Sequence, residues 1–422
     1  MSGLKVLVAG ASIAGTSTAY WLAKSGARVT VIERFPQLRT GGQAVDIRTA
    51  GVTVMRKMVG MEALVRAKST QEEGIGFARE DGSLYGVIRA TGNPDQQSLI
   101  SEYEIFRGDL VEILYDLTRD DEKIEYVFGE QIASIQQSKR DVGPIEVEFA
   151  NGLPSTTFDL VVGCDGATSR TRALGFGCGV RDHLVPTGLW TAYWSLEKDL
   201  LNGSRIGQGF NAIGGRSISL GSDPAGGSRA MVMNSQPLGV NDPKLDLFRE
   251  AARKGDDALK DFVARGYRDV GWKTPACLQG MRDAKDFYAS EMVQVQVPSL
   301  SKGRFVLVGD AGYAAGPTGG GTSLALTGAY ILAGELSKHP GDIAAGLQAY
   351  DDQMRPIITD LQNIPPFLST FMMPQTAWGI WLRNQIFAII AWSGVAEFGQ
   401  KYLATSFAST DSFPLPNYQW PA

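Results

Sequence analysis

The stretch LKVLVAGASIAG, from Leu4 to Gly15, decides the fold predicted for this chain. Leu4–Ala9 is an apolar run typical of a buried strand, Gly10–Gly15 predicts a tight turn, and Thr16–Ser25 has a helical pattern. A second apolar segment, Arg28–Glu33, predicts a strand that ends on an acidic residue about twenty residues after the turn. A strand, a glycine turn, a helix and an acidic residue in this order indicate a Rossmann-type α/β domain that binds a dinucleotide.

The residues of this turn suit a pyrophosphate group. Gly10 allows the sharp turn, and Gly15 allows the helix to pack closely against the strand. Ser12 replaces the middle glycine of the usual pattern, but it is small and its hydroxyl can donate a hydrogen bond; Ala14 completes the expected contact. The N–H groups and the positive dipole at the helix start would hold the phosphates, and Glu33 would accept hydrogen bonds from the adenosine ribose. The turn alone does not distinguish NAD from FAD.

Two later segments favour a flavin dinucleotide. DGATSRTR at residues 165–172 follows the apolar run Phe158–Gly163, and GDAGYAAGPTGGG at residues 309–321 follows the run Arg304–Val308. Both segments therefore begin at the carboxyl end of a predicted strand, where open α/β sheets bind their ligands. The three segments together fit one molecule of FAD.

On these segments the chain resembles the single-component FAD-dependent aromatic monooxygenases of the para-hydroxybenzoate hydroxylase group, and within them the tetracycline-inactivating and polyketide-modifying branch. Two further matches are EIFRGDL at residues 104–110 and GGQAVDIR at residues 41–48. The matches lie in the family's order. The family patterns D-G-x-x-S-x-x-R and G-D-A correspond here to Asp165, Gly166, Ser169 and Arg172, and to Gly309, Asp310 and Ala311.

The resemblance implies roles for several of the matched residues. Asp165 would lie near the flavin pyrophosphate and the path of the reduced nicotinamide, and Asp310 would accept a hydrogen bond from a ribityl hydroxyl. Arg107 would contact FAD, Asp46 would lie beside the flavin, and Arg39 is a candidate for the nicotinamide phosphate. The remaining expected cofactor contacts are Arg34 and the glycines that open the last helix against the flavin ring, Gly319, Gly320 and Gly321.

The chain departs from the family pattern around the flavin ring. Gly312 and Tyr313 follow G-D-A where the family commonly has alanine and histidine, and Gly328 replaces an aspartate often found in the following helix. Thr322 and Ser323 stand where the family commonly ends its glycine-rich turn in G-x-N. The catalytic candidates facing the ring cavity are Arg48 and Tyr313, because both neighbour flavin motifs.

The resemblance implies a monooxygenase with non-covalent FAD, NADPH or NADH as co-substrate, and O2. Hydride would reduce FAD, and a flavin C4a-hydroperoxide would transfer one oxygen atom to an aromatic or polyketide-like small molecule. Two alternatives stay open: a flavin-dependent reductase of the same superfamily that inserts no oxygen, and a flavoprotein that sequesters an aromatic ligand. A flavin halogenase is disfavoured, because the chain has no G-W-x-W-x-I-P segment. The sequence does not distinguish which reaction the oxygen transfer performs: hydroxylation, epoxidation, Baeyer–Villiger insertion or oxidative decarboxylation.

Composition excludes several other classes of protein. The net charge of −5 gives no general attraction to nucleic acid. Only 2 histidines are present, which argues against a histidine-rich metal site and against a Ser-His-Asp hydrolase, so no metal is expected. The 3 cysteines are odd in number and far apart, which indicates a reducing, cytoplasmic setting without structural disulfides.

The 422 residues exceed one ordinary core, so two domains and a terminal extension are expected. Glycine-broken alternating segments between Thr187 and Gln236 predict an antiparallel sheet over the substrate cavity. Alternation along it could direct some of its large side chains into that cavity; these are Trp190, Tyr193, Trp194, Met231 and Met233. We expect an FAD-binding domain at 1–75, 100–180 and 280–345, an inserted substrate domain at 76–99 and 181–279, and a C-terminal helical extension at 346–422.

The C-terminal extension contains the apolar run Ile386–Val395, which is shorter than the roughly 20 residues of a bilayer span. Trp378, Trp381 and Trp392 cluster with Phe387 in this region. We expect these aromatic residues to pack in the core, with peripheral membrane contact by the C-terminal helix as the alternative. A monomer or a weak dimer is expected.

Overall fold

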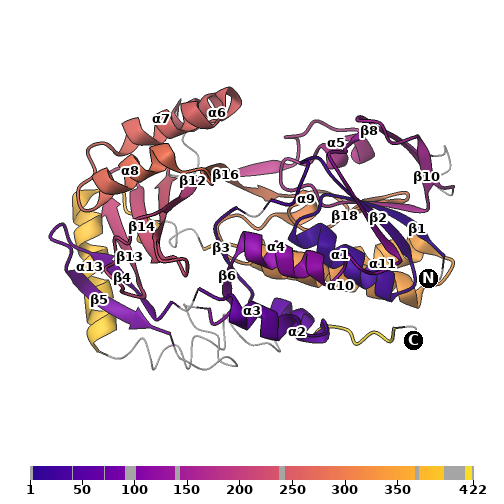
Figure 1. The fold of residues 1–422 in the computed structure, drawn as a ribbon, viewed down its shortest axis with the longest axis horizontal. Helices are drawn as coiled ribbons and strands as arrows, with labels where there is room; N and C mark the ends of the chain where they lie inside the picture. The colour runs from indigo at the N-terminus through magenta and orange to yellow at the C-terminus, as the bar shows by residue number, and fades with distance from the viewer. Residues whose placement is uncertain are drawn as a thin grey trace.

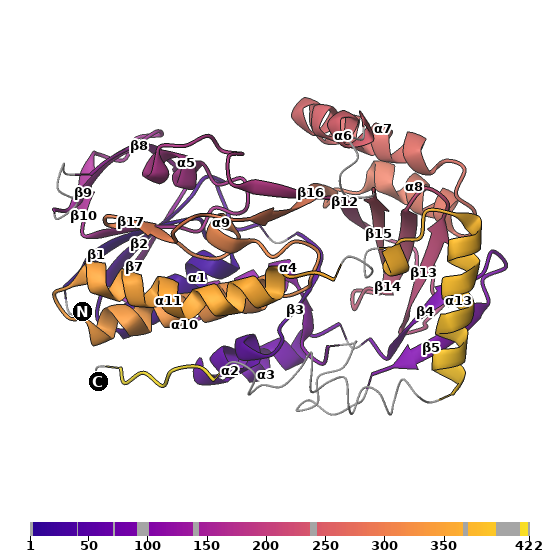
Figure 2. The same ribbon diagram turned by 180° about the vertical axis from the view of Figure 1, so that it is seen from behind.

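The computed structural model describes residues 3–39, 41–70, 72–90, 101–137, 143–236, 243–365, 370–393 and 414–420. Two large sheets organise these residues, one of six strands and one of seven (Figures 1 and 2). The two sheets lie at opposite ends of the long axis, and β12 and β16 run from one end toward the other.

The six-stranded sheet has the order β17-β18-β11-β1-β2-β7, and its pairs are parallel except β17–β18. Its central strands are almost wholly buried, which explains their continuous apolar sequences. This arrangement confirms the Rossmann-type α/β fold expected from the sequence. The strands are β1 (Lys5–Ala9), β2 (Arg28–Glu33), β7 (Ile124–Phe128), β11 (Leu160–Gly163), β17 (Ser301–Lys302) and β18 (Phe305–Leu307).

Helices and a small sheet cover the two faces of the parallel sheet (Figures 1 and 2). One face carries α1 (Ile13–Lys24), α4 (Arg107–Asp116), α10 (Gly321–Lys338) and α11 (Ile343–Gln362). The other carries α5 (Arg170–Phe176) and the three-stranded sheet of β8 (Ile132–Gln136), β9 (Ile145–Phe149) and β10 (Thr156–Phe158). α10 packs against α1, α11 and α2 (Ala50–Lys57), with α3 (Met61–Ala67) beyond α2, so α10 is buried over nearly its whole length.

The seven-stranded sheet has the order β16-β12-β15-β14-β13-β4-β5 and is antiparallel except for the β13–β4 pair. It confirms the antiparallel sheet predicted from the alternating segments. A two-stranded ribbon, β3 (Ala44–Asp46) with β6 (Glu104–Phe106), lies between the two large sheets (Figure 1). The seven strands are β4 (Gly74–Ala78), β5 (Leu84–Arg89), β12 (Leu184–Leu196), β13 (Ile206–Ala212), β14 (Arg216–Ser222), β15 (Ser228–Ser235) and β16 (Tyr288–Val295).

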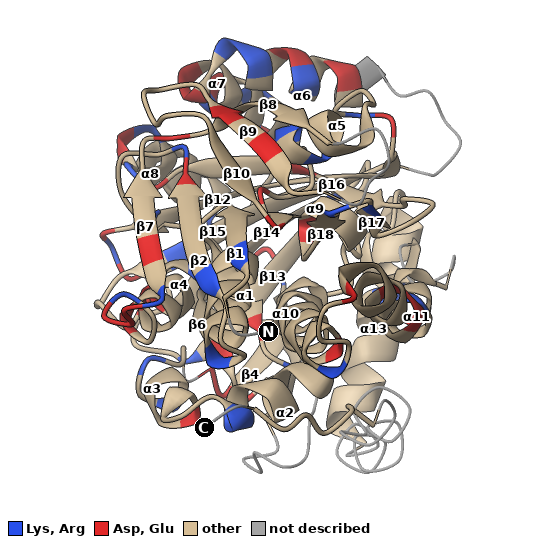
Figure 3. Cartoon of the chain, turned by 90° about the vertical axis from the view of Figure 1, so that its right-hand side faces the viewer, with Lys and Arg blue, Asp and Glu red and all other residues tan. Residues whose placement is uncertain are grey.

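Three helices cover one face of this sheet: α6 (Pro243–Lys254), α7 (Asp256–Tyr267) and α8 (Thr274–Asp283). The sequence pattern predicts one helix over 244–266, but Gly255 has φ of 101° and divides it into α6 and α7. Charged residues of both signs are interspersed on α6 and α7 (Figure 3). Under these helices Trp190 stacks on Phe248 at 5.1 Å, and Trp194 Nε1 donates to the Cys277 carbonyl at 3.0 Å.

Trp190 and Trp194 therefore face the helices and not a cavity. Tyr193 and Met231 are register partners, and with Met233 they point to the opposite face of the sheet, where they are half-buried. β16 lies within the range 280–345 that the sequence assigns to the FAD-binding domain, yet it joins the seven-stranded sheet. The domain boundaries as numbered above stay a prediction.

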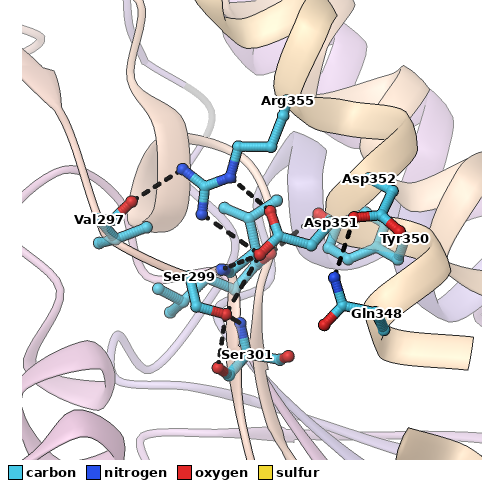
Figure 4. A network of polar contacts seen from close by, with 10 residues as sticks. Val297, Ser299, Ser301, Gln348, Tyr350, Asp351, Asp352 and Arg355 are labelled. Carbon is cyan, nitrogen blue, oxygen red and sulfur yellow. Dashed lines mark hydrogen bonds and ion pairs between the residues drawn. The ribbon is translucent and has the colours of Figure 1, made fainter. Parts of the chain in front are cut away.

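α11 is fixed to the parallel sheet by a polar network around Asp351 (Figure 4). The Asp351 carboxylate accepts from the Ser299 hydroxyl and from the Leu300 backbone N–H, both at 3.1 Å. Arg355 pairs with the same carboxylate and donates to the Val297 carbonyl at 2.8 Å. These contacts hold the connection between β16 and β17, and thereby the strand that leads into the G-D-A segment.

Helix α13 (Ala377–Trp392) packs across β5 and β13 at the outer end of the seven-stranded sheet (Figures 1 and 2). Phe387 is buried against Phe77, with ring centroids 4.8 Å apart. Trp378, Trp381 and Trp392 are instead 68%, 54% and 90% exposed, so the expected core packing is wrong for the three tryptophans. The three tryptophans lie on the sides of α13 that do not pack against the sheet. Among the described residues, no helix is long and apolar enough to cross a bilayer.

Candidate cofactor and substrate site

Four loops meet at one edge of the parallel sheet. β1, β2, β11 and β18 run in the same direction, so their carboxyl ends lie together. Gly10 follows β1, Glu33 ends β2, Asp165 comes two residues after β11, and Asp310 comes three residues after β18. The structure thus brings the three sequence segments to one place.

Three glycines of this edge leave no room for a side chain. A Cβ atom on Gly15 would lie 1.7 Å from the Gly10 carbonyl oxygen. Gly10 and Gly309 have φ of 109° and 70°, and a Cβ on Gly309 would lie 2.7 Å from the Cβ of Ala14. The first turn of α1 therefore packs directly on the end of β1 and on the G-D-A segment.

The start of α1 is open to an anion. Ser12 is the N-cap residue, but its side chain caps no backbone N–H, and the first turn has no acidic residue. The Ser12 hydroxyl instead accepts a hydrogen bond of 2.7 Å from Arg107 Nη2. Unsatisfied N–H groups, the helix dipole and a guanidinium together make a site for a phosphate group.

Arg107 is the first residue of α4 and is enclosed by the chain. Gly42 has φ of 135°, and a Cβ there would lie 3.3 Å from the Arg107 side chain, so the segment before β3 runs directly over it. Burial lowers the pKa of Arg107, and the negative charges of Asp310 and Glu33 act in the opposite direction. The charge of Arg107 therefore acts on two of the carboxylates that the sequence assigns to FAD, Asp310 and Glu33.

The two carboxylates at the ends of β2 and β11 differ in what they already bind. Glu33 accepts from the Ala11 N–H at 3.0 Å and from the Phe35 N–H at 3.1 Å, which fixes its orientation and leaves acceptor capacity on both oxygens. Asp165 accepts from the Thr171 N–H and hydroxyl, each at 3.0 Å, and from the Ser169 hydroxyl. Asp165 thus holds the start of α5, and its contact with the cofactor stays a prediction.

Arg172, the arginine of the D-G-x-x-S-x-x-R pattern, received no role from the sequence. Its side chain is fully buried and donates to the carbonyls of Ala311 at 2.7 Å, Ala167 at 2.9 Å and Val180 at 2.8 Å. It ties the loop after β11 to the G-D-A segment. Its fixed spacing from Asp165 was the available sequence signal.

The flavin-ring end of the site is formed by β3 and the glycine-rich turn. Asp46 and Arg48 form an ion pair of 3.0 Å, and the Arg48 N–H donates to the Ser323 hydroxyl at 2.8 Å. A Cβ on Gly319 would lie 3.9 Å from Asp46 Oδ2. The segment around Asp46 thus lies directly against the turn, with Arg48 paired to Asp46.

Asp310 lies at the other side of the glycine-rich turn, since a Cβ on Gly321 would be 3.5 Å from Asp310 Oδ1. Its side chain is exposed, but the protein atoms around it desolvate the carboxylate and raise its pKa, which Arg107 partly offsets.

Arg34 and Arg39 flank the Phe35 ring at 4.8 and 5.0 Å, and Arg39 also lies 5.6 Å from the centre of the Tyr288 ring. Both arginines add positive charge beyond the end of β2.

Tyr313 is 1% exposed and lies in the core, which corrects the expectation that it faces the ring cavity. Its hydroxyl accepts a hydrogen bond of 3.2 Å from the Tyr350 hydroxyl. A Cβ on Gly328 would lie 1.8 Å from that same Tyr313 oxygen. Tyr313 and Gly328 are two departures from the family pattern, fifteen residues apart. They belong to one packing arrangement, because Gly328 makes room for the Tyr313 side chain.

A cavity of about 460 Å³ opens between β3–β6 and the seven-stranded sheet, and its carboxylates were missed by the sequence analysis. Glu104 accepts from the Thr70 hydroxyl at 2.6 Å, and burial raises its pKa. Burial, then the charges of Glu104 and Asp46, raise the pKa of Glu72 to about 8. Asp46 and Glu104 are register partners, so this cavity adjoins the flavin-ring end. It is lined by Ser69, Glu72, Glu73, Arg89, Ala90, Ser101, Glu102, Glu104 and Arg205.

We expect Glu72→Gln to stabilise the protein at alkaline pH. Since the folded chain raises the pKa of Glu72 to about 8, it keeps a proton there that the unfolded chain loses near its ordinary pKa. Stability contributed by this group is therefore present below the ordinary pKa and is lost as the pH rises through about 8. Thermal unfolding with saturating FAD should show Glu72→Gln more stable by about 1–2 kcal/mol at pH 8.5, with no gain near pH 4.5.

The exposed neighbour Glu73 supplies the control, because Glu73→Gln removes a charge without relieving burial. That variant should stay within about 0.5 kcal/mol of the wild type at both pH values. Equal melting temperatures of wild type and Glu72→Gln at pH 8.5 would contradict the burial of this carboxylate.

Known proteins agree with this geometry. The FAD binding domain family model matches residues 3–191. The FAD-dependent monooxygenase asL4 of Sarocladium schorii is 32% identical, over 93% of this chain and 93% of its own length. The chain belongs to the FAD-dependent monooxygenases. This confirms the family and the enzymatic class expected from the sequence motifs.

Solved structures of other flavin monooxygenases share the fold. The tetracycline destructase Tet(55) is similar with a TM-score of 0.76 and 29% identity, over 99% of this chain and 100% of its own. HpxO of Klebsiella pneumoniae, complexed with FAD and uric acid, has a TM-score of 0.68 at 19% identity, over 95% and 97% of the two chains, and supports the fold alone. The likeness to a tetracycline destructase agrees with the branch that the GGQAVDIR segment indicates.

FAD is the cofactor of this monooxygenase, and the residues at the sheet edge fit it. The uncapped start of α1 with Arg107 suits the pyrophosphate, and a fixed acceptor, Glu33, stands at the end of β2. The glycines at positions 10, 15 and 309 keep this edge free of side chains, so the backbone itself lines it. The cysteines Cys164, Cys178 and Cys277 are free thiols.

Proposed function

We propose that this monooxygenase uses NADPH or NADH and O2 to insert one oxygen atom into an aromatic or polyketide-like small molecule. The observation that carries the proposal is that Asp46 lies against the glycine-rich turn while its register partner Glu104 lines the 460 Å³ cavity. A cavity of that volume suits a small organic molecule. The likeness to a tetracycline destructase supports an aromatic or polyketide-like substrate class.

The chain positions the cofactor in four parts. The α1 start, with Ser12 and Arg107, binds the pyrophosphate, and Glu33 accepts from the adenosine ribose. Asp310 accepts from the ribityl chain. Gly319, Gly320 and Gly321 with Asp46 border the ring; bound FAD supplies the redox chemistry there, while the protein supplies orientation and exclusion of water.

The cavity groups orient the substrate and hold its protons. Glu72 keeps its proton up to a pH of about 8, so at neutral pH it is a hydrogen-bond donor to a substrate oxygen. Arg48, paired with Asp46 and bonded through its backbone N–H to Ser323, polarises a substrate oxygen at the ring. Tyr193, Met231 and Met233 lie on the face of the seven-stranded sheet that its helices leave uncovered.

The sequence has no second glycine turn after a strand–helix pair for binding the nicotinamide co-substrate. The co-substrate therefore meets FAD through transient contacts, with Arg39 as the contact of its phosphate. The enzyme works in the cytoplasm as a monomer or weak dimer, with no nucleic-acid partner. Peripheral membrane contact by α13 stays a prediction, which the exposure of its three tryptophans supports.

Turnover under labelled oxygen tests the proposal. Phenolic and polyketide compounds are screened for acceleration of NADPH oxidation, and products are analysed by mass spectrometry after reaction under ¹⁸O₂. We expect one ¹⁸O atom per product molecule. NADPH-dependent reduction of a compound without gain of ¹⁸O would establish the reductase alternative, and tight binding without NADPH oxidation would establish the sequestering flavoprotein.

A further inference from the structure

A second cavity of about 210 Å³ lies between α13 and the outer strands of the seven-stranded sheet. It is far from the flavin edge, because β4 leads away from Glu72 toward it. Phe77 lines this cavity and stands five residues after Glu72, which corresponds to roughly 16 Å along a strand. The lining residues are Phe77, Ala78, Arg79, Glu80, Tyr85, Gly209, Phe210, Asn211, Ile380, Arg383 and Asn384.

Arg383 forms the charged wall of this cavity and is only 2% exposed. Its Nη2 donates to Asn211 Oδ1 at 2.7 Å, and its guanidinium lies 3.6 Å from the centre of the Phe77 ring. Nε and Nη1 are buried and have no hydrogen-bond partner in the part of the chain that the structure describes. Two strong donors are thus left unsatisfied.

The charges around Arg383 do not neutralise it. Tyr85 is the titratable group whose charge acts on it, and burial lowers the pKa of Arg383 to about 10. Arg79 lines the same cavity and donates to the Ser83 hydroxyl and the Leu84 carbonyl. Glu80 also lines it, but a Cβ on Gly271 would lie 2.9 Å from Glu80 Oε1, which places that carboxylate against the α7–α8 connection. No ion pair joins Arg383 to a carboxylate among the described residues.

A buried guanidinium without an anionic partner is costly, because it loses hydration that nothing replaces. We propose that the cavity under α13 binds a small oxyanion, a carboxylate or a phosphate, through Nε and Nη1 of Arg383. Asn384 is 6% exposed and its Oδ1 has no partner within the described chain; turned about, its amide offers N–H donors to the same anion. Arg383 of α13 donates to Asn211 of β13, so the bound anion would lie where the helix joins the sheet.

Thermal unfolding and calorimetric titration of the FAD-loaded enzyme test this site with two probes, sodium benzoate and inorganic phosphate, each against chloride at equal ionic strength. At least one probe should raise the melting temperature of the wild type to a plateau. Arg383→Gln should weaken that binding ten-fold or more, since hydrogen bonds to a charged group are lost. Binding of benzoate alone identifies an organic carboxylate as the ligand class, and binding of phosphate alone identifies a phosphate.

Asn384→Asp gives an independent test, because it places a carboxylate in the lining of the same cavity as Arg383. This variant should melt at a higher temperature than the wild type in chloride and gain nothing further from either probe. Salts that stabilise proteins by exclusion from the surface act equally on all three proteins. An equal rise in all three, or no rise above chloride in the wild type, would overturn the proposal. If Arg383→Gln does not fold, the comparison of wild type with Asn384→Asp decides.

Discussion

Replacing Gly15 by alanine is expected to weaken FAD binding by at least a hundred-fold. The added Cβ would lie 1.7 Å from the Gly10 carbonyl oxygen, and that oxygen belongs to the backbone, so it cannot turn aside. The first turn of α1 must move away from β1, and it takes with it the N–H groups that face the pyrophosphate. A loss of about 2.7 kcal/mol of binding free energy corresponds to a hundred-fold change in affinity.

A matched control separates this clash from the general effect of a glycine-to-alanine change. Gly266 lies in α7, its ideal Cβ would meet nothing within 4 Å, and it has no positive φ. Gly266→Ala should keep the wild-type FAD affinity and gain slightly in stability, since alanine favours a helix. Fluorescence titration of the apoprotein with FAD measures both variants. A Gly15→Ala protein that binds FAD like the wild type would show that the cofactor does not lie on this turn.

The cofactor edge could be predicted from the sequence because its determinants are local. Gly10, Gly15 and Glu33 lie within one strand–helix–strand unit, and their spacing follows from the geometry of that unit alone. The later segments could be added because each follows an apolar run. The carboxyl ends of parallel strands meet at one edge whatever the intervening chain does, so Asp310 had to lie near Gly10.

The rest depends on contacts between distant segments, which a single sequence does not encode in a readable pattern. Tyr313 is predicted to face the cavity because it neighbours a flavin motif. The structure buries it instead, because Gly328, fifteen residues later, has no side chain and leaves room for the Tyr313 hydroxyl group. The three carboxylates near the 460 Å³ cavity could not be predicted for the same reason. Glu72 comes before β4, while Glu104 and Asp46 lie on paired strands of a separate ribbon, so only the tertiary fold brings the three carboxylates together.

The C-terminal helix shows a further limit. The apolar run Ile386–Val395 predicts a helix at this end of the chain, but the tryptophans that suggested burial are exposed, and the buried face of α13 carries Arg383, Asn384 and Phe387. A polar residue in a buried position contradicts the pattern that sequence analysis relies on. Such contradictions are expected where a chain binds something other than itself.

Arg107→Met is expected to raise the Kd for FAD by roughly ten- to a hundred-fold, because a hydrogen bond to a charged group contributes about 1.5–3 kcal/mol. The substitution keeps an unbranched side chain of similar length under Gly42 but removes the donor to the Ser12 hydroxyl. It also removes the positive charge that acts on Asp310 and Glu33, so the desolvation of the Asp310 carboxylate is no longer offset. Arg107→Lys should recover part of the affinity, since a single ammonium replaces the fork-shaped guanidinium. Arg119→Met, which breaks only exposed ion pairs with Asp116 and Asp120 at the far end of α4, is the matched control and should bind FAD normally. Equal Kd values for Arg107→Met and Arg119→Met would place the pyrophosphate away from Arg107 and refute the assignment of this end of the site.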